Sequence, residues 1–141
     1  MKKIVIIGAN DFQNQLILKA KEMGFETHVF AWQDGSIGER TADHFYPVSI
    51  VEIDEILEKC REIKPDAVAT IASDLANITV SKVAAGLGLP GNTPECIELS
   101  TNKYAMRSAF LKAGLPTPKF YKVDRVIPEL MEMELPVIVK P

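Results

Sequence analysis

Residues 3–13 read Lys3-Ile4-Val5-Ile6-Ile7-Gly8-Ala9-Asn10-Asp11-Phe12-Gln13. The first five residues form a nearly continuous apolar run, which is typical of a strand that is covered on both faces of its sheet. The glycine that follows marks a turn, and a helical pattern begins at about Phe12. A buried strand that leads through a short loop into a helix predicts an α/β fold with parallel strands.

The same alternation of strand and helix continues through most of the chain. Strand patterns follow at residues 26–31, 44–48 and 67–71, and helical patterns occupy residues 12–23, 52–63 and 76–87. The inward-facing positions of the first helix are predicted to be Leu16, Ile17, Ala20 and Met23, and Gly24 is predicted to end it. These patterns predict an α/β domain with an open parallel sheet and helices on both of its faces.

After Gly91 the pattern changes to shorter elements separated by prolines. We expect an amphipathic helix that ends at Gly114, then a strand at residues 120–123, a helix at residues 125–133 and a final strand at residues 135–141. This change of character indicates that a second domain begins in the last third of the chain.

The domain boundaries predicted from these patterns divide the chain into three parts. Residues 1–92 form the first domain, residues 93–115 form linker helices, and residues 116–141 begin the second domain. The apolar residues 137–139 of the final strand need a pairing partner. A homodimer that exchanges this strand would supply one.

Composition sets limits on the partners of the chain. The 141 residues carry a formal net charge of −3, which gives no general attraction to nucleic acid or to an anionic membrane. No apolar run approaches the ~20 residues of a membrane span. Cys60 and Cys96 are too few and too far apart for a zinc site or a disulfide framework, so we expect reduced thiols in a cytoplasmic protein.

The loop between the first strand and the first helix lies where dinucleotide-binding folds hold a pyrophosphate. That fingerprint requires glycine at three positions, but only Gly8 is present, with Asn10 and Gln13 in the other two places. An NAD-type oxidoreductase is therefore disfavoured, although Asp34 near the end of the second strand keeps that alternative open. The simplest structural interpretation is that Asn10 or Asp11 caps the helix.

A second polar loop follows the fourth strand. If the strand order is 3-2-1-4, this loop and the first one flank the crevice in which open parallel sheets bind their ligands. The candidate substrate-binding residues are Asn10, Asp11, Gln13, Ser73 and Asp74. Helix capping by Ser73 or Asp74 is the structural alternative.

Two lysines are candidates for binding an anion. Lys103 begins a helix, where the macrodipole disfavours a cation by about 0.3–1 kcal/mol unless an anion shares the site. Arg107 lies one turn further on and adds positive charge. Lys140 ends the last predicted strand, where it either binds phosphate or protects a strand edge from aggregation. For Lys103 and Arg107 the alternative is a solvated basic helix face.

Three further residues give weaker signals. Neither His28 nor His44 has metal-ligand spacing to another histidine, cysteine or acid, so the sequence predicts no metal ligand. Trp32 follows the second strand, where it either packs in the core or forms the wall of a pocket. No catalytic residue is predicted.

Four short motifs follow one another in the second half of the chain. They are Gly88-Leu89-Pro90-Gly91, Thr101-Asn102-Lys103, Gly114-Leu115-Pro116-Thr117-Pro118 and Leu135-Pro136-Val137-Ile138-Val139-Lys140-Pro141. In this order and spacing they resemble the front end of an ATP-grasp ligase, closest to carbamoyl phosphate synthetase-like and phosphoribosylglycinamide synthetase-like proteins. The resemblance covers nearly the whole chain. It implies a Rossmann-like pre-ATP-grasp domain, followed by a linker helix and the first elements of an ATP-grasp domain.

The resemblance also implies a reaction. Such a ligase phosphorylates a carboxylate or bicarbonate with ATP and passes the acyl phosphate to an amine-type nucleophile, while magnesium and lysines neutralise the phosphates. Lys103 would contact the nucleotide, Lys140 would reach the α-phosphate, and the loop at Asn10 would face the acceptor substrate. The magnesium ligands are expected beyond residue 141, which makes this chain an inactive amino-terminal fragment. The alternatives are a stand-alone small-molecule binding domain and, with less support, the NAD-type oxidoreductase.

Overall fold

The structure is a computed structural model of the chain that describes residues 1–126, 128–133 and 135–140. The chain divides into two compact units, Met1–Thr101 and Asn102–Pro141. None of the helices in the described ranges is both long and apolar enough to cross a membrane.

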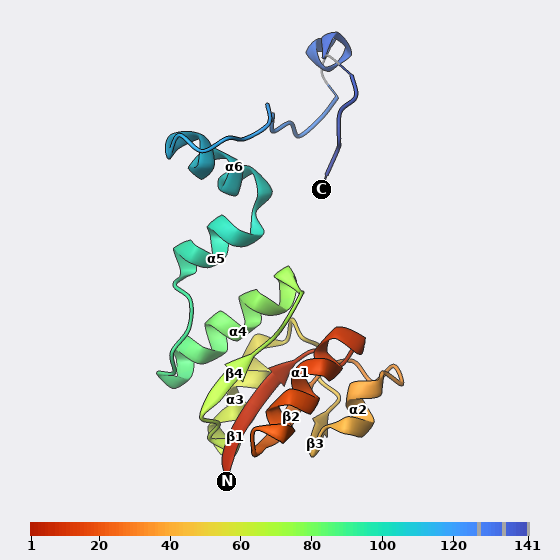
Figure 1. Cartoon of the computed structure of the whole chain (residues 1–141), viewed down its shortest axis with the longest axis vertical. Helices are drawn as coiled ribbons and strands as arrows, with labels where there is room; N and C mark the ends of the chain where they lie inside the picture. Colours follow the sequence, from red (N-terminus) through yellow and green to blue (C-terminus); the bar gives the residue numbers. More distant parts are fainter. Residues whose placement is uncertain (127, 134, 141) are drawn as a thin grey trace. The chain divides into compact units, whose positions relative to one another are not determined.

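The first unit is built on a four-stranded parallel sheet (Figure 1). Its strands are β1 (Lys2–Ile7), β2 (Phe25–Phe30), β3 (His44–Tyr46) and β4 (Ala67–Ala69). Their order is β3-β2-β1-β4, and every neighbouring pair is parallel. The predicted α/β class and the parallel sheet are therefore confirmed, and the strand order is the 3-2-1-4 arrangement on which the predicted crevice depended.

Helices cover both faces of this sheet. The first unit contains α1 (Asp11–Glu22), α2 (Ile37–Thr41), α3 (Ile53–Ile63), α4 (Asp74–Leu87) and α5 (Pro94–Thr101). Val5 and Ile7 of β1 are buried in one apolar cluster with residues of α3 and α4, whereas Ile4 and Ile6 are buried in a second cluster with residues of α1. The alternation of side chains along β1 thus supplies apolar contacts to two separate cores.

The first helix differs from its prediction at one end. Ile17 and Ala20 are buried, as predicted, but Met23 is 65% exposed. The helix ends at Glu22, and Met23 is its C-cap, so its side chain no longer follows the helical period. Gly24 adopts a φ of +82° directly after this cap, in agreement with the predicted stop.

The short helix α2 was not predicted from the sequence. Its five residues give too little periodicity for a sequence pattern. A close contact explains the glycine within it: the N–H of Gly38 donates to the carbonyl of Ala9 at 3.0 Å, and a Cβ on Gly38 would lie 2.6 Å from that oxygen. The helix therefore packs directly on the loop that follows β1.

Asp43 joins three parts of the first unit. Its carboxylate accepts hydrogen bonds from Lys21 Nζ (2.6 Å), from the backbone N–H of Thr27 (2.9 Å) and from the Thr27 hydroxyl (2.8 Å). The hydrogen bond from Lys21, followed by that from the Thr27 backbone, lowers the pKa of Asp43 to about 2. The end of α1, strand β2 and the entry to β3 are held together by this carboxylate.

Replacing Asp43 by Asn is expected to destabilise the chain by about 1–2 kcal/mol at pH 7, because the charge-assisted hydrogen bonds are lost. The folded-state pKa lies below that of a free carboxyl, so this stabilisation is complete above about pH 4 and is lost as pH falls toward 2. Urea unfolding at pH 7 and pH 3 measures the effect. Exposed Asp54, replaced by Asn, serves as the control. Equal stability of the Asp43→Asn chain and the wild type at pH 7 would contradict the expectation.

The two cysteines lie in opposite environments. Cys60 is buried, and burial raises the pKa of its thiol to about 12, whereas Cys96 is exposed. We expect one thiol equivalent to react rapidly with Ellman's reagent in the native chain and two in guanidinium, since only the thiolate attacks. The Cys96→Ser variant should lose the rapid phase, and the Cys60→Ala variant should keep it. Two rapid equivalents in the native protein would refute this assignment.

The second unit contains α6 (Lys103–Lys112) and a 3-10 helix at Pro128–Glu132. The predicted helix before Gly114 is confirmed, and Gly114 has a φ of +69°. The predicted strands are wrong in the described residues, because residues 120–123 and 135–140 form neither helix nor strand. A strand requires a neighbour for its backbone hydrogen bonds, and these segments pair with none of the four described strands. Pro141, the last residue of the predicted final strand, lies outside the described residues.

Candidate functional site

Two capped loops lie together at the carboxyl ends of the central strands. Asn10 follows β1 and caps α1, with its Oδ1 accepting a hydrogen bond from the Gln13 N–H at 3.1 Å. Ser73 follows β4 and caps α4, with its Oγ accepting from the Ala76 N–H at 3.2 Å. Because β1 and β4 are parallel neighbours, both loops lie at the same edge of the sheet. The capping interpretation is confirmed for Asn10 and Ser73.

Gln13 connects these two loops. Its Nε2 donates a hydrogen bond to the carbonyl of Ile71, and its Oε1 accepts one from the Ile71 N–H at 3.1 Å. The side chain is buried, with a relative exposure of 1%. The structure therefore places Gln13 as a link between the loops, whereas the neighbouring Asp11 and Asp74 are exposed. Contact of these residues with a substrate stays a prediction.

The backbone conformation of Gly8 and its close neighbour Gln13 explain why this loop position is a glycine. Its φ of +104° lies in the region that favours glycine, and a Cβ there would lie 2.9 Å from Cγ of Gln13. The single glycine of the incomplete dinucleotide fingerprint thus makes room for the Gln13 side chain.

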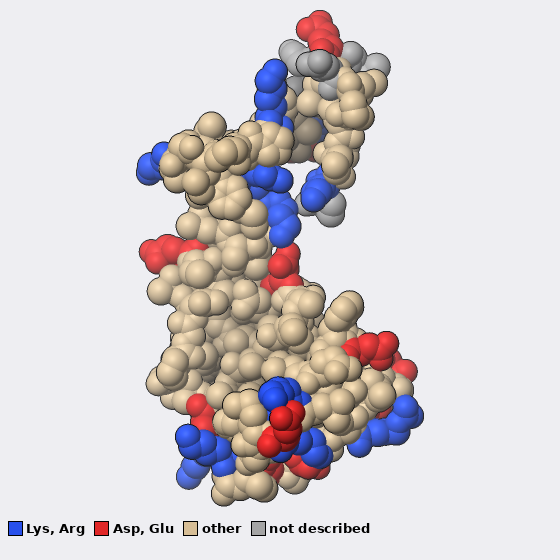
Figure 2. All heavy atoms as spheres, viewed as in Figure 1, with Lys and Arg blue, Asp and Glu red and all other residues tan. Residues whose placement is uncertain are grey.

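Exposed apolar side chains surround the same edge of the sheet. They are Phe12, Trp32, Ile71 and Leu75. Trp32 is 68% exposed, so the interpretation that it packs in the core is wrong. Figure 2 shows the acidic and basic side chains of this unit mixed over its lower part, where the strands begin. The carboxyl-end edge therefore combines exposed apolar side chains with the carboxylates of Asp11 and Asp74, which suits a small ligand that has both apolar and polar groups.

Lys103 and Lys140 both belong to the second unit. Lys103 is the first residue of α6, and Asn102 caps this helix by accepting from the N–H groups of Tyr104 and Ala105, both at 3.1 Å. Those two amides are therefore already satisfied, so an anion near Lys103 would depend on the ammonium group more than on the helix end. Arg107 donates to the Thr117 hydroxyl at 3.4 Å. Lys140 is exposed in a segment without regular secondary structure.

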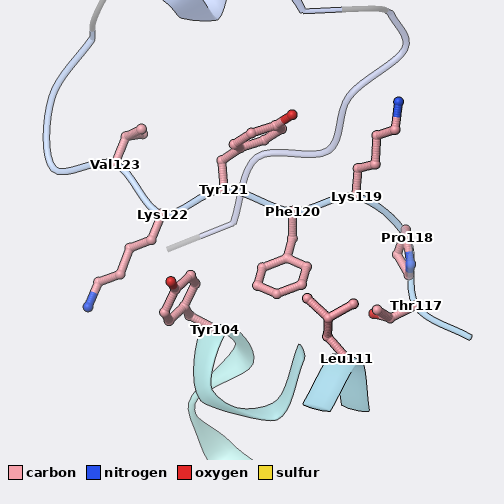
Figure 3. A pocket seen from close by; sticks show the side chains of 9 residues that line it. All are labelled: Tyr104, Leu111, Thr117, Pro118, Lys119, Phe120, Tyr121, Lys122 and Val123. Atoms are coloured by element: carbon pink, nitrogen blue, oxygen red, sulfur yellow. The ribbon is translucent and has the colours of Figure 1, made fainter. Parts of the chain in front are cut away.

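The second unit also has a groove that the sequence did not reveal (Figure 3). It has a volume of about 640 Å³ and is lined by Tyr104, Leu111 and residues 117–123. The rings of Tyr104 and Phe120 meet edge to face with centroids 5.6 Å apart, and Lys122 Nζ lies 5.6 Å from the Tyr104 centroid. The combination of aromatic walls and lysines can accept a flat apolar ring that carries an anionic group.

Sequence spacing also failed to reveal a cluster at the edge of the sheet. Strand pairing places His28 directly opposite His44, and Glu26 lies on the same strand as His28. Ligand-type atoms of these three residues lie within 4.8 Å of one another. The spacing of the histidines along the chain, from which no metal ligand was predicted, gave no sign of this approach, because it depends on the register of β2 with β3.

Known proteins resemble this chain over nearly its whole length. No family model matches it. Formate-dependent phosphoribosylglycinamide formyltransferase of Prochlorococcus marinus is 22% identical over 145 residues, and the match covers 99% of this chain and 37% of that protein. Phosphoribosylglycinamide synthetase from Anaerococcus prevotii has 27% identity and a TM-score of 0.69, and the match covers 80% of this chain and 29% of that one.

Two further solved structures share the fold. L-amino acid ligase from Bacillus licheniformis has a TM-score of 0.77 at 23% identity, with 98% of this chain and 36% of that one covered. N5-carboxyaminoimidazole ribonucleotide synthetase in complex with ADP has a TM-score of 0.65 at 24% identity, with 84% and 30% covered.

The chain matches the amino-terminal part of ATP-grasp ligases. The resemblance found from the four motifs is thereby confirmed. The chain spans a little over a third of the length of the curated relative, 37%. The parallel sheet of the first unit, with helices on both faces, is the fold that was predicted for a pre-ATP-grasp domain.

The link made by Gln13 gives a testable consequence. Replacing Gln13 by Met keeps the length of the side chain but removes both of its part-buried hydrogen bonds to the N–H and carbonyl of Ile71. We expect a loss of about 1–3 kcal/mol in the free energy of unfolding, together with faster hydrogen exchange at Ile71. Gln15→Met on the exposed side of the same helix is the control. Unchanged exchange at Ile71 in the Gln13→Met chain would refute the link.

Proposed function

We propose that this chain is the amino-terminal part of an ATP-dependent ligase that activates a carboxylate or bicarbonate as an acyl phosphate for attack by an amine. The observation that supports this most strongly is the match of 99% of the chain to an ATP-grasp relative. An ADP complex among the structures that share the fold supports the use of ATP. The domain division 1–92, 93–115 and 116–141 is part of this proposal.

In this proposal the two units have different tasks. The carboxyl-end edge of the first unit, with Asn10, Asp11, Ser73 and Asp74 in its loops, faces the acceptor substrate. Gln13 acts indirectly, by holding the loops at Asn10 and Ile71 in a fixed relation. An amine acceptor matches the carboxylates of Asp11 and Asp74, which are exposed at this edge.

Lys103 and Lys140 are proposed to bind the phosphates of ATP. Both side chains are exposed, so neither needs to leave a buried position in order to reach a ligand. A lysine ammonium suits phosphate because it is a compact charge on a flexible stem. Magnesium supplies neutralisation of the phosphate charge when bound, and its ligands are proposed to lie beyond residue 141. The 141-residue chain alone is proposed to have no ligase turnover.

The test uses the full-length protein, read from the coding sequence past the Pro141 codon. The assay measures ADP release with ATP, magnesium and one carboxylate at a time, among them formate, bicarbonate and amino acids. Hydroxylamine traps the acyl phosphate as a hydroxamate, which reports the intermediate directly. ADP release without a carboxylate-dependent hydroxamate would overturn the proposed reaction.

The lysines are tested in the same assay. Lys103→Met and Lys140→Met are each expected to lower the rate of ADP release at least about tenfold, because a phosphate loses a neutralising charge. Lys112→Met, at the other end of α6, is the matched control and should keep the wild-type rate. A double Lys103/Lys140 variant with the wild-type rate would exclude a phosphate role for both. The 141-residue chain, assayed alongside, should show no turnover, and measurable turnover would contradict its fragment status.

A further inference from the structure

The cluster at the sheet edge lies away from the proposed substrate site. Glu26 and His28 are two residues apart along β2, so their side chains lie on the same face of the sheet. His44 is the first residue of the neighbouring strand β3 and pairs with His28. The candidate substrate-binding residues lie at the carboxyl ends of β1 and β4, whereas Glu26 and His44 lie near the amino ends of β2 and β3. A role for this cluster is therefore independent of the ligase proposal.

His28 is held in one orientation, and one of its nitrogens has no hydrogen bond. Its Nδ1 lies 2.9 Å from the Tyr46 hydroxyl. Its Nε2 is buried and makes no hydrogen bond with the described residues, although it lies 3.2 Å from Glu26 Oε1. Burial, and then the neighbouring His44, lower the pKa of His28. A buried nitrogen without a partner is costly unless another group occupies the position beside it.

Glu26 supplies the negative charge of the cluster. Its Oε1 lies 3.0 Å from Nε2 of His44 as well as 3.2 Å from Nε2 of His28. Burial acts to raise the pKa of Glu26, but the hydrogen bond from His44, together with the neighbouring His28 and Lys3, lowers it below its ordinary value. The carboxylate lies beside both imidazoles.

We propose that Glu26, His28 and His44 bind a divalent transition metal of the zinc class. Two imidazole nitrogens and one carboxylate oxygen form a ligand set that favours zinc over magnesium or calcium, which prefer oxygen alone. When Nδ1–H of His28 donates to the Tyr46 oxygen, the lone pair of Nε2 is left for the metal. The fourth position is open to solvent on the side of His44, which is half-exposed.

Metal binding requires one rearrangement. The rings of His28 and His44 are stacked, with centroids 4.5 Å apart and an angle of 17° between their planes. Lone pairs lie in the ring planes, and nearly parallel planes cannot both contain one ion. His44 therefore turns about its side-chain bonds, which its exposed position on the short strand β3 permits, while the buried His28 keeps its orientation. The metal would then fasten β3 to β2.

The experiment is a zinc titration of the 141-residue chain by calorimetry at pH 7.5. The Cys96→Ser background removes the exposed thiol, which is itself a zinc ligand. We expect one equivalent to bind, with a rise in Tm of the first unit. The nitrogen resonances of His28 and His44 in ¹⁵N NMR should shift on addition of the same equivalent.

Variants assign the binding to the cluster. His44→Ala and Glu26→Gln should each weaken zinc binding at least about tenfold. Glu22→Gln on α1 is the matched control and should bind like the parent chain. His44 is half-exposed, so its replacement leaves the core intact, and circular dichroism confirms the fold of each variant. Absence of stoichiometric binding would overturn the proposal, as would binding that survives both replacements with unchanged histidine resonances.

Discussion

Burial of β1 on both of its faces is the constraint on which the first unit depends. Its four residues Ile4, Val5, Ile6 and Ile7 are all buried, two in each apolar cluster. Each such side chain contributes about 1.5–3 kcal/mol, so together they are comparable with the whole net stability of a domain, about 5–15 kcal/mol. A strand with this composition must have strands on both edges and helices on both faces. The positions of α1 on one face and of α3 and α4 on the other follow from it.

The same arrangement forms the candidate site. Since β1 and β4 are parallel neighbours, the loops that leave them begin side by side, and Gln13 joins them through the backbone of Ile71. The polar side chains of Asn10 and Ser73 stabilise helix ends, so they serve the fold whatever ligand is bound. The exposed apolar side chains at this edge and the carboxylates of Asp11 and Asp74 are the groups that this edge presents at the surface of the first unit.

The sequence correctly predicted the features that depend on residues close together along the chain. The strands, the long helices, the capping of α1 by Asn10 and the stop at Gly24 are local features of propensity and periodicity. The predictions from the sequence failed where contacts between residues distant along the chain determine the position or burial of a side chain. The contact of His28 with His44 and Glu26 depends on strand register, and the burial of Gln13 depends on a loop 58 residues away. The exposure of Trp32 likewise depends on its surroundings in space. The apolar residues 137–139 read as a strand, but their propensity cannot supply a pairing partner.

The central position of the first strand has a consequence for synthesis on the ribosome. Among the four strands of the sheet β1 comes first along the chain; it pairs with β2 on one edge and with β4 on the other, and β4 begins only at Ala67. At about 5–20 residues per second, roughly 3–12 seconds separate the emergence of these two strands. During that interval the most apolar strand of the nascent chain has one edge without a partner. A chaperone that protects nascent chains would find its binding site here, in a strand whose apolar residues 4–7 are buried once β4 has paired with it.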